Sequence, residues 1–310
     1  MNILIGSNGG LTGIYLAKTL SKIKDAAVFG ADSSEVNPGK FFVSKQFLLP
    51  KALDINFLDQ LIFLLNDEKI DYYFPTHSME TKIVSKYANQ LTERCNCKFM
   101  VSPYSTFEAL DSKCISNRNL AENGIPVPKE IEDLDCEYPI IMKRNIGSGG
   151  SGKQIIDNGR LHVAYCECSK DVSFYEYIEG TEYTVDCLFG YNGELIVCNQ
   201  RIREKTIAGA VSISRTCNDF DIKPWINKIS SIWKFCGCVN FQFILRNNVP
   251  YFIDINLRFP SGGLPVTVEQ GYNIPQMMVD IMDGKKMDIP VVNSNNIRMY
   301  RYFEEIFEEL

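Results

Sequence analysis

Short apolar runs, each followed by a helical pattern, constrain the first hundred residues more than any other feature of the chain. The runs "MNILI", "AAVFGAD" and "DYYFP" have the length and composition of buried strands. Segments such as "LDINFLDQLIFLLNDEKI" lie between or after them and repeat apolar residues at helical spacing. Because strands that alternate with helices form a parallel sheet, residues 1–100 are predicted to fold as a doubly wound α/β domain.

The pattern changes after residue 100. "STFEALDSKCISNRNLAENG" predicts a pair of helices, and later strand patterns dominate in an α+β arrangement. The turn sequences "DNG" and "YNG" predict hairpins, and a further hairpin is predicted across 246–249. We expect three units, which span residues 1–100, 101–180 and 181–310.

Composition excludes several classes of partner. With 310 residues, a net charge of −6 and no basic stripe, the chain is not expected to bind nucleic acid. It has no basic leader and no apolar run of about 18 residues, so we expect a cytoplasmic protein without membrane contact. Its eleven cysteines include three C-x-C pairs, which we interpret as packing residues because structural zinc sites use wider spacing.

The stretch "KRNIGSGGSGKQII" contains G-x-x-x-x-G-K, but Gln154 stands where a P-loop needs a hydroxyl. A P-loop also opens a helix, whereas strand patterns flank this loop on both sides. We therefore expect a flexible hairpin that covers phosphates with its backbone amides, and the alternative is a solvated turn.

A second Gly-rich turn, "GSNGGLTG", follows the first strand and precedes a helix. Asp32 lies at the end of the next strand, as in dinucleotide-binding folds. However, Asn8 replaces the middle glycine of the fingerprint. The turn is interpreted as a tight strand-to-helix connection, with NAD(P) binding as the alternative. His77 and Glu80 lie at the same predicted sheet edge, where helix capping is favoured over substrate contact.

Alternating polar residues mark the strand "VPYFIDINLRF". Asp254, Asn256 and Arg258 point to one face, and Gln242 lies on the partner strand of the predicted hairpin. Oxygen ligands beside a guanidinium predict a site for Mg²⁺ bound to phosphate. An internally satisfied polar network is the alternative.

Together these segments resemble the ATP-grasp superfamily, and within it the carbamoyl-phosphate-synthase-like carboxylate–amine ligases. The motifs occur in the order "DSKCISNR", "IIMKRNIGSGGSGK", "YEYIEGTEYTVD" and "DINLRF". The resemblance implies an α/β pre-ATP-grasp domain followed by the two-subdomain ATP-grasp fold. The sequence departs from the family at one metal-binding position, because family members usually have Glu where this chain has Asp254.

By that resemblance, the site residues are expected to fall into three groups. The nucleotide group is Lys113, Lys143, Gly147, Ser148, Gly149, Gly150, Ser151, Glu176, Tyr177, Ile178, Glu179 and Glu182. Within it, the two lysines are expected to bind phosphates, Glu176–Ile178 to contact adenine, and Glu182 to bind ribose. The metal group is Gln242, Asp254 and Asn256. The catalytic group is Arg258, Lys143, Arg201 and Arg203. Arg258 is expected to stabilise the transferred phosphoryl group. Arg201 and Arg203 are expected to bind a carboxylate or acylphosphate, and the alternative is that they form a solvated basic edge.

The function implied is that of an ADP-forming ligase. It would use ATP and Mg²⁺, with Mn²⁺ as a substitute, to convert a carboxylate into an acylphosphate and couple it to an amine. The partners expected are small-molecule carboxylate and amine substrates, and we also consider a homodimer. Two alternatives stay open, an NAD(P)-dependent oxidoreductase and a non-catalytic ATP-binding protein on the same fold.

Overall fold

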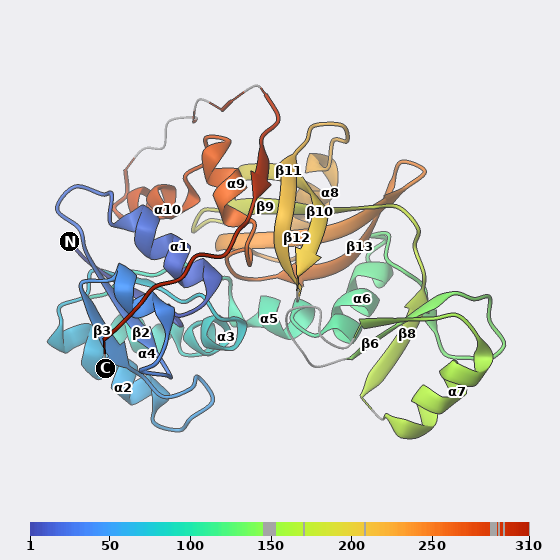
Figure 1. Ribbon diagram of the computed structural model, residues 1–310, viewed down its shortest axis with the longest axis horizontal. Helices are drawn as coiled ribbons and strands as arrows, with labels where there is room; N and C mark the ends of the chain where they lie inside the picture. Colours follow the sequence, from blue (N-terminus) through green and yellow to red (C-terminus); the bar gives the residue numbers. More distant parts are fainter. Residues whose placement is uncertain are drawn as a thin grey trace.

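The computed structural model describes residues 1–144, 153–169, 171–207, 209–285, 290, 292–293 and 295–309. The predicted loop residues Gly147–Ser151 lie outside these ranges. Three sheets follow one another along the molecule, and the small sheet lies farthest from the N-terminal sheet (Figure 1). Within the described ranges, no helix is long and apolar enough to cross a membrane.

The first sheet is parallel, as predicted. Its strands in spatial order are β3 (Lys45–Leu48), β2 (Ala27–Asp32), β1 (Asn2–Gly6) and β4 (Tyr72–Phe74). The helices of this part are α1 (Leu11–Leu20), the short η1 (Pro38–Phe42), α2 (Phe57–Asp67), α3 (Ser78–Lys86) and α4 (Ala88–Arg94). The side chains alternate across the sheet, so Leu4 packs on the α2 side while Ile3 and Ile5 pack on the α1 side.

The face of this sheet that carries Ile3 and Ile5 is completed from the far end of the chain. α9 (Leu264–Glu269) and α10 (Ile274–Met282) contribute Leu264, Ile274 and Met278 to the same apolar core. All of these side chains are almost fully buried. The N-terminal sheet and the C-terminal helices therefore share one core.

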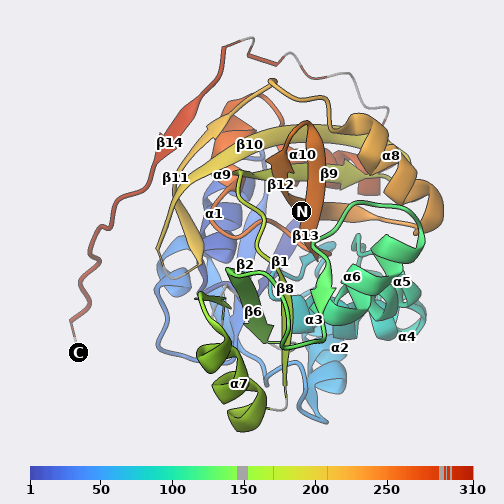
Figure 2. The ribbon, with the colours of Figure 1, turned by 90° about the vertical axis from the view of Figure 1, so that its right-hand side faces the viewer.

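The second sheet is antiparallel and has six strands. In spatial order these are β13 (Val249–Asn256), β12 (Gly237–Arg246), β9 (Thr181–Phe189), β10 (Leu195–Ile207), β11 (Ala210–Thr216) and β14 (Arg298–Tyr300). Helices α5 (Tyr104–Leu110), α6 (Lys113–Glu122) and α8 (Lys223–Ile232) cover its outer face, where Val185, Phe241 and Phe243 are buried. The inner face carries polar residues. Figure 2 shows the segment after β14 as an extended strip that leaves the second sheet, and near its end Glu308 forms an ion pair with Lys40 at 2.7 Å.

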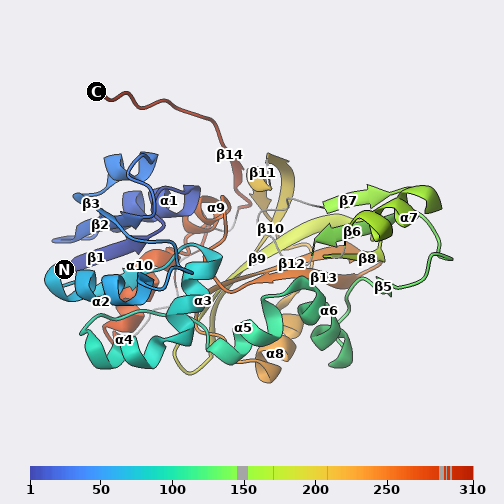
Figure 3. The same cartoon turned by 90° about the horizontal axis from the view of Figure 1, so that it is seen from below.

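The third sheet is small and antiparallel, and with α7 (Gly159–Cys168) it forms the end of the molecule opposite the first sheet (Figure 3). Its strands are β5 (Glu130–Ile131), β8 (Val172–Glu176), β6 (Ile140–Arg144) and β7 (Lys153–Ile156). A small core of its own holds it together, which includes Ile140, Met142, Ile156 and Phe174. The strand pattern on both sides of the Gly-rich loop is therefore confirmed.

Two sequence predictions are wrong in this region. "DNG" is not a hairpin turn, because the Asn158 side chain accepts a hydrogen bond from Leu161 N at 3.2 Å and begins α7 as its N-cap. The C-x-C pair Cys166 and Cys168 on α7 is exposed, so it does not pack in a core, whereas the other two pairs are buried. The domain boundaries expected at residues 100 and 180 remain a prediction.

Candidate active site

A cavity of about 460 Å³ lies among the three sheets and is lined by residues of each. Most of the predicted site residues that the structure describes line it, namely Lys113, Lys143, Glu182, Arg201, Arg203, Gln242, Asp254, Asn256 and Arg258. Among the lining residues that the structure describes, seven are Lys or Arg and two are carboxylates, Glu182 and Asp254. In a chain of net charge −6, such a local excess of cations indicates an anionic ligand.

The floor of the cavity is built from rows of side chains that run across the inner face of the second sheet. Strand register places one row in the order Asp254, Gln242, Thr184 and Arg201, and all four line the cavity. The next row is Asn256, Asn240, Asp186 and Asn199. Neighbouring strands are about 4.8 Å apart, so the backbones of Asp254 and Arg201 are separated by about 14 Å.

A β-bulge shapes the β13 end of the floor. The pairing of β12 with β13 shifts between Gln242 and Phe243, which leaves Ile253 as an extra residue. Consequently Ile253 and Asp254 both line the cavity, although adjacent strand residues normally face opposite ways. The bulge thus places an apolar side chain beside the carboxylate.

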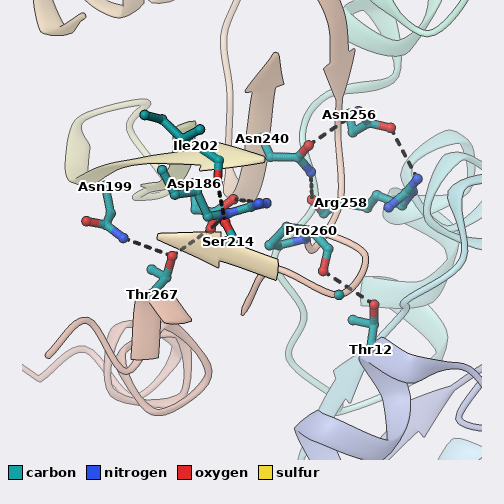
Figure 4. A network of polar contacts seen from close by, with 12 residues as sticks. Thr12, Asp186, Asn199, Ile202, Ser214, Asn240, Asn256, Arg258, Pro260 and Thr267 are labelled. Atoms are coloured by element: carbon teal, nitrogen blue, oxygen red, sulfur yellow. Dashed lines mark hydrogen bonds and ion pairs between the residues drawn. The ribbon is translucent and has the colours of Figure 1, made fainter. Parts of the chain in front are cut away.

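The predicted polar residues of β13 form a hydrogen-bonded chain, part of which Figure 4 shows. Asn256 Nδ2 donates to Asp254 Oδ2 at 3.1 Å and to Asn240 Oδ1 at 3.3 Å. Arg258 Nη2 donates to Asn256 Oδ1 at 3.1 Å, and Arg258 Nε donates to Ser78 Oγ at 2.5 Å. Arg258 therefore joins the second sheet to the start of α3. Burial lowers the pKa of Arg258, and the charge of Asp254 opposes this shift.

At the other end of the floor, Arg201 is held by a buried ion pair. Its Nε donates to Asp186 Oδ2 at 2.9 Å and its Nη2 donates to Asp186 Oδ1 at 3.2 Å, while the side chains are 2% and 0% exposed. Thr267 Oγ1 donates to Asp186 Oδ2 at 2.6 Å, and Asn199 Nδ2 donates to Thr267 Oγ1 at 2.9 Å. Gly263 allows this arrangement because a Cβ there would lie 2.1 Å from Arg201 Cζ. The guanidinium thus has a fixed position.

Arg203 and Glu182 lie on the same face of the sheet, two residues along β10 and β9 from the pair Arg201 and Thr184. Arg203 Nη1 donates to Glu182 Oε1 at 2.8 Å, and Arg203 Nη2 donates to the carbonyl of Gly209 at 3.0 Å. The solvated basic edge considered for Arg201 and Arg203 is therefore wrong, because both arginines are paired with acids and line the cavity.

Four cations face the floor from the side of the small sheet and α6. These are Lys113, Lys143, Arg144 and Lys153. Lys143 Nζ lies 5.0 Å from the centroid of the Tyr175 ring. Desolvation lowers the pKa of Lys143 to about 8, opposed by Asp254 and assisted by the charges of Lys153 and Lys113. Such mutual repulsion among lysines is relieved by an anion between them.

The segment Glu176–Glu179 does not line the cavity. It connects β8 of the small sheet to β9 of the second sheet, and Ile178 is buried there while Glu179 is exposed. Glu176 Oε1 accepts a hydrogen bond from Arg246 Nη2 at 2.9 Å, so an ion pair joins the two sheets at this connection. The adenine-binding role expected for Glu176, Tyr177 and Ile178, and the assisting role of Glu179, remain predictions.

The donor set at the β13 end suits Mg²⁺ that also binds phosphate. Asp254 supplies one carboxylate and Gln242 lies opposite it in register, but Asn256 Oδ1 already accepts from Arg258. Within the described part of the chain, no three His, Cys, Asp or Glu side chains form a metal-holding group. Mg²⁺ commonly takes one or two protein carboxylates, substrate phosphates and water, which fits a site with a single Asp.

Side chains of the protein occupy the space at the N-terminal Gly-rich turn where a dinucleotide would bind. Asp32 Oδ2 accepts a hydrogen bond from Gly9 N at 3.0 Å, and Asn8 is fully buried in reciprocal hydrogen bonds with Gln46. The interpretation as a strand-to-helix turn therefore agrees with the structure. A dinucleotide would need the space that Asn8 fills and the acid that Gly9 engages.

His77 and Glu80 cap and support the start of α3. His77 Nδ1 accepts from Met79 N at 3.3 Å, and burial lowers the pKa of His77. His77 also lines the cavity, as does its neighbour Ser78, whereas Glu80 lies behind Ser7. Capping is therefore correct for His77, and Glu80 does not reach the cavity.

Several lining residues were not predicted as site residues. Thr184, Asn240 and Lys153 line the cavity, and Asp186 holds Arg201 from beneath it. Alternation within "TEYTVDCLFG" places Thr184 and Asp186 on the same face as Glu182, so the sequence contained this signal.

Comparison with solved structures identifies the fold. N5-carboxyaminoimidazole synthetase from Staphylococcus aureus complexed with ADP is 20% identical, with a TM-score of 0.74 and coverage of 94% of this chain and 79% of that one. Biotin carboxylase from Campylobacter jejuni is 18% identical, with a TM-score of 0.74 and coverage of 96% and 74%. L-amino acid ligase from Bacillus licheniformis is 17% identical, with a TM-score of 0.69 and coverage of 94% and 75%.

The chain has the ATP-grasp fold, which confirms the resemblance and the predicted fold class. More specifically, residues 169–304 match the family model described as "ATP-grasp in the biosynthetic pathway with Ter operon". A search of the curated proteins found no match.

Proposed function

We propose that the protein is an ATP- and Mg²⁺-dependent ligase that joins a carboxylate to an amine through an acylphosphate. The observation that carries this proposal is one cavity in which cations from the small sheet face Asp254 and Gln242 on the second sheet and Arg258 just after β13. The similar solved structures support it, since one is complexed with ADP and another is named as an L-amino acid ligase.

The cations would bind the triphosphate. Lys113, Lys143 and Lys153 approach from the small sheet and α6 and provide N–H donors to phosphate oxygens. We place adenine at the connection formed by Glu176–Ile178, and ribose at Glu182, whose row lies nearer that connection than the Asp254 row.

Asp254 and Gln242 would hold Mg²⁺, with Asn256 as the third oxygen donor. The ion would neutralise charge on the β- and γ-phosphates when bound. The protein's own contribution beside it is Arg258, which hydrogen bonds to Asn256 and Ser78 keep in place. Its positive charge would stabilise the phosphoryl group during transfer.

The reaction requires no protein nucleophile. A carboxylate oxygen forms a bond to the γ-phosphorus while the bond from that phosphorus to the β,γ-bridging oxygen breaks, which releases ADP. The amine nitrogen then attacks the acyl carbon, and phosphate leaves with the carboxylate oxygen. The amine proton passes to phosphate or solvent. Positioning and charge neutralisation supply the catalysis.

The direct test is a screen of carboxylic acids and amines for phosphate release from Mg-ATP. For a pair that reacts, the carboxylate is labelled with ¹⁸O and the phosphate is analysed by mass spectrometry. We expect one ¹⁸O atom per phosphate. Unlabelled phosphate would exclude the acylphosphate, while ATP binding without any turnover would favour the non-catalytic alternative.

Asp254→Asn tests the metal assignment before any substrate is known. We expect Mg²⁺ to tighten ADP binding at least tenfold in the unchanged protein and to have almost no effect in the variant, because the carboxylate is lost. Calorimetry of ADP binding with and without Mg²⁺ measures this, and Asp67→Asn, at an exposed position, is the control. An unchanged Mg²⁺ effect in Asp254→Asn would refute the assignment.

We also propose that the protein is cytoplasmic and that its substrates are small molecules, on the basis of its composition. The homodimer remains a prediction.

A further inference from the structure

Among the polar atoms of the cavity lining that are buried without a hydrogen-bond partner, two lie in the same row of the floor. They are Arg201 Nη1 and Thr184 Oγ1, and their side chains are 2% and 0% exposed. Both residues line the cavity, and they lie directly opposite each other on β10 and β9. Buried polar groups are nearly always paired in folded proteins, so two adjacent unpaired groups on a cavity floor indicate a ligand.

The Arg201 guanidinium is oriented for such a ligand. Asp186 takes Nε and Nη2, and Gly263 packs against the guanidinium, so Nη1 is the donor left over. Because these contacts fix the side chain, binding an anion there costs little conformational entropy. An oxyanion is the group that a guanidinium and a hydroxyl both bind.

The N-terminus of α1 faces the same cavity. Gly10, Leu11 and Thr12 line it, no side chain caps the helix, and its first turn contains no acidic residue. Thr12 Oγ1 donates to the carbonyl of Pro260 at 3.5 Å, which ties this turn to the loop that leads to Gly263. A free helix N-terminus favours an anion, and here it supplements the unpaired atoms of Arg201 and Thr184.

This end of the floor is separate from the place proposed for the phosphoryl group. The backbone of Arg201 lies about 14 Å from that of Asp254, because three strand spacings separate them. We therefore treat the group bound at Arg201 as separate from the γ-phosphate that Mg²⁺ would hold at Asp254.

We propose that Arg201, Thr184 and the α1 N-terminus form a second anion subsite, which binds a non-reacting carboxylate or phosphate group of a substrate. The inference rests on the proposed ligase function and narrows its substrate class. One of the two substrates is an acid or an amine that carries an additional oxyanion, as a dicarboxylic acid, a phosphorylated acid or an amino acid does. A simple monocarboxylic acid paired with a simple amine does not satisfy the subsite.

Binding to the full chain in the presence of saturating Mg-ADP tests the subsite with matched probes. Succinate is compared with butyrate, 3-phosphonopropanoate with butyrate, and β-alanine with propylamine. In at least one pair, we expect the probe with the additional oxyanion to bind about tenfold more tightly than the probe without it. The pair that shows the difference identifies whether the additional group is a carboxylate or phosphate, and whether acid or amine carries it.

Variants then assign the effect to these residues. Thr184→Val should reduce the affinity for the probe with the additional oxyanion about tenfold. Thr184→Ser, which keeps the hydroxyl, should retain the original affinity. Because Thr184 Oγ1 has no partner in the protein, Thr184→Val should fold normally. Arg201→Met combined with Asp186→Leu removes the buried ion pair as a unit and should abolish the preference.

Equal affinity within every probe pair would overturn the subsite, as would a preference that Thr184→Val leaves unchanged. Mg-ADP binding separates these outcomes from failure of the ligase proposal. Normal Mg-ADP binding without any preference among the probes would refute the subsite alone, whereas a protein that binds no Mg-ADP would refute both.

Discussion

Glu80 is a carboxylic acid that the fold almost completely encloses. It is 3% exposed, and it accepts hydrogen bonds from Ser7 Oγ at 2.5 Å and from the Tyr73 hydroxyl. Burial raises the pKa of Glu80 from 4.5 to about 7, and the two hydrogen bonds only partly oppose this. Between these two pH values the folded protein keeps a proton that the unfolded chain releases, so stability falls as the pH rises.

We therefore expect Glu80→Gln to remove a pH-dependent part of the stability. From pH 4.5 to 8, the free energy of unfolding of the unchanged protein should fall by about 3 kcal/mol more than that of the variant. Urea unfolding at the two pH values measures this difference. Glu122→Gln, at an exposed position, should behave like the unchanged protein. Parallel pH profiles for Glu80→Gln and the unchanged protein would contradict the assignment.

Lys143 predicts how nucleotide binding depends on pH. Its pKa of about 8 means that the free protein loses this charge as the pH rises above 8. Phosphate oxygens favour the charged form and raise the pKa again, so ADP binding at pH 9 should take up protons, whereas binding at pH 7 should take up almost none.

Calorimetry in buffers of different ionisation enthalpy measures this proton uptake. We expect most of it to disappear in Lys143→Met and to persist in Lys24→Met, at an exposed position. Uptake that is the same in both variants would show that another group binds the proton.

Single residues also show how far the sequence predicts the site. Asp254, Asn256 and Arg258 were found because alternation along one strand is visible in the sequence. The ion pair of Arg201 with Asp186 was not found, because it depends on the register between two strands, which composition and alternation do not determine. Likewise, no local pattern predicts the bulge that turns Ile253 toward the cavity.

Among the elements, the β12–β13 hairpin confirms its prediction in detail. Its turn residues Asn247 and Asn248 have φ values of 53° and 61°, which two-residue hairpin turns require and Asn tolerates. By contrast, the "DNG" at the start of α7 was predicted as a hairpin turn, because Asn and Gly are typical of both turns and helix N-caps. The elements that define the site were thus easier to predict than those that cover it.

The hairpin gives a stability prediction. Asn248→Gly should raise the free energy of unfolding by about 0.5 to 1 kcal/mol, since glycine adopts positive φ without steric cost. Thermal or urea unfolding measures the change. The control is Asn192→Gly in the β9–β10 turn, where φ is not positive and glycine should give no gain. Equal effects at both positions would mean that backbone conformation is not the cause.

At the scale of the whole molecule, the shared core determines which fragments can fold. Ile3 and Ile5 are 0% exposed and pack with Ile274 and Met278 of α10. A fragment of residues 1–125 keeps α1 but lacks α10, so the part of this face that α10 covers would be exposed to water. The three sheets therefore do not represent three independently stable units.

We expect the fragment 1–125 to show no cooperative unfolding transition and to bind a hydrophobic dye strongly. Circular dichroism during urea titration and dye fluorescence measure these two properties, with the full chain as the control. A cooperative transition in the fragment would show that the first sheet is stable without α10.

The same core has a consequence during protein synthesis. The strands of the first sheet are complete at Phe74, but α10, which covers one face together with α1, ends at Met282. At translation rates of about 5 to 20 residues per second, that face would wait for roughly 10 to 40 s on the ribosome. The cavity, which needs Ser7 and Ser78 beside Arg258, would thus assemble only after Arg258 has been synthesised, and exposed apolar surface of this kind is what chaperones protect until then.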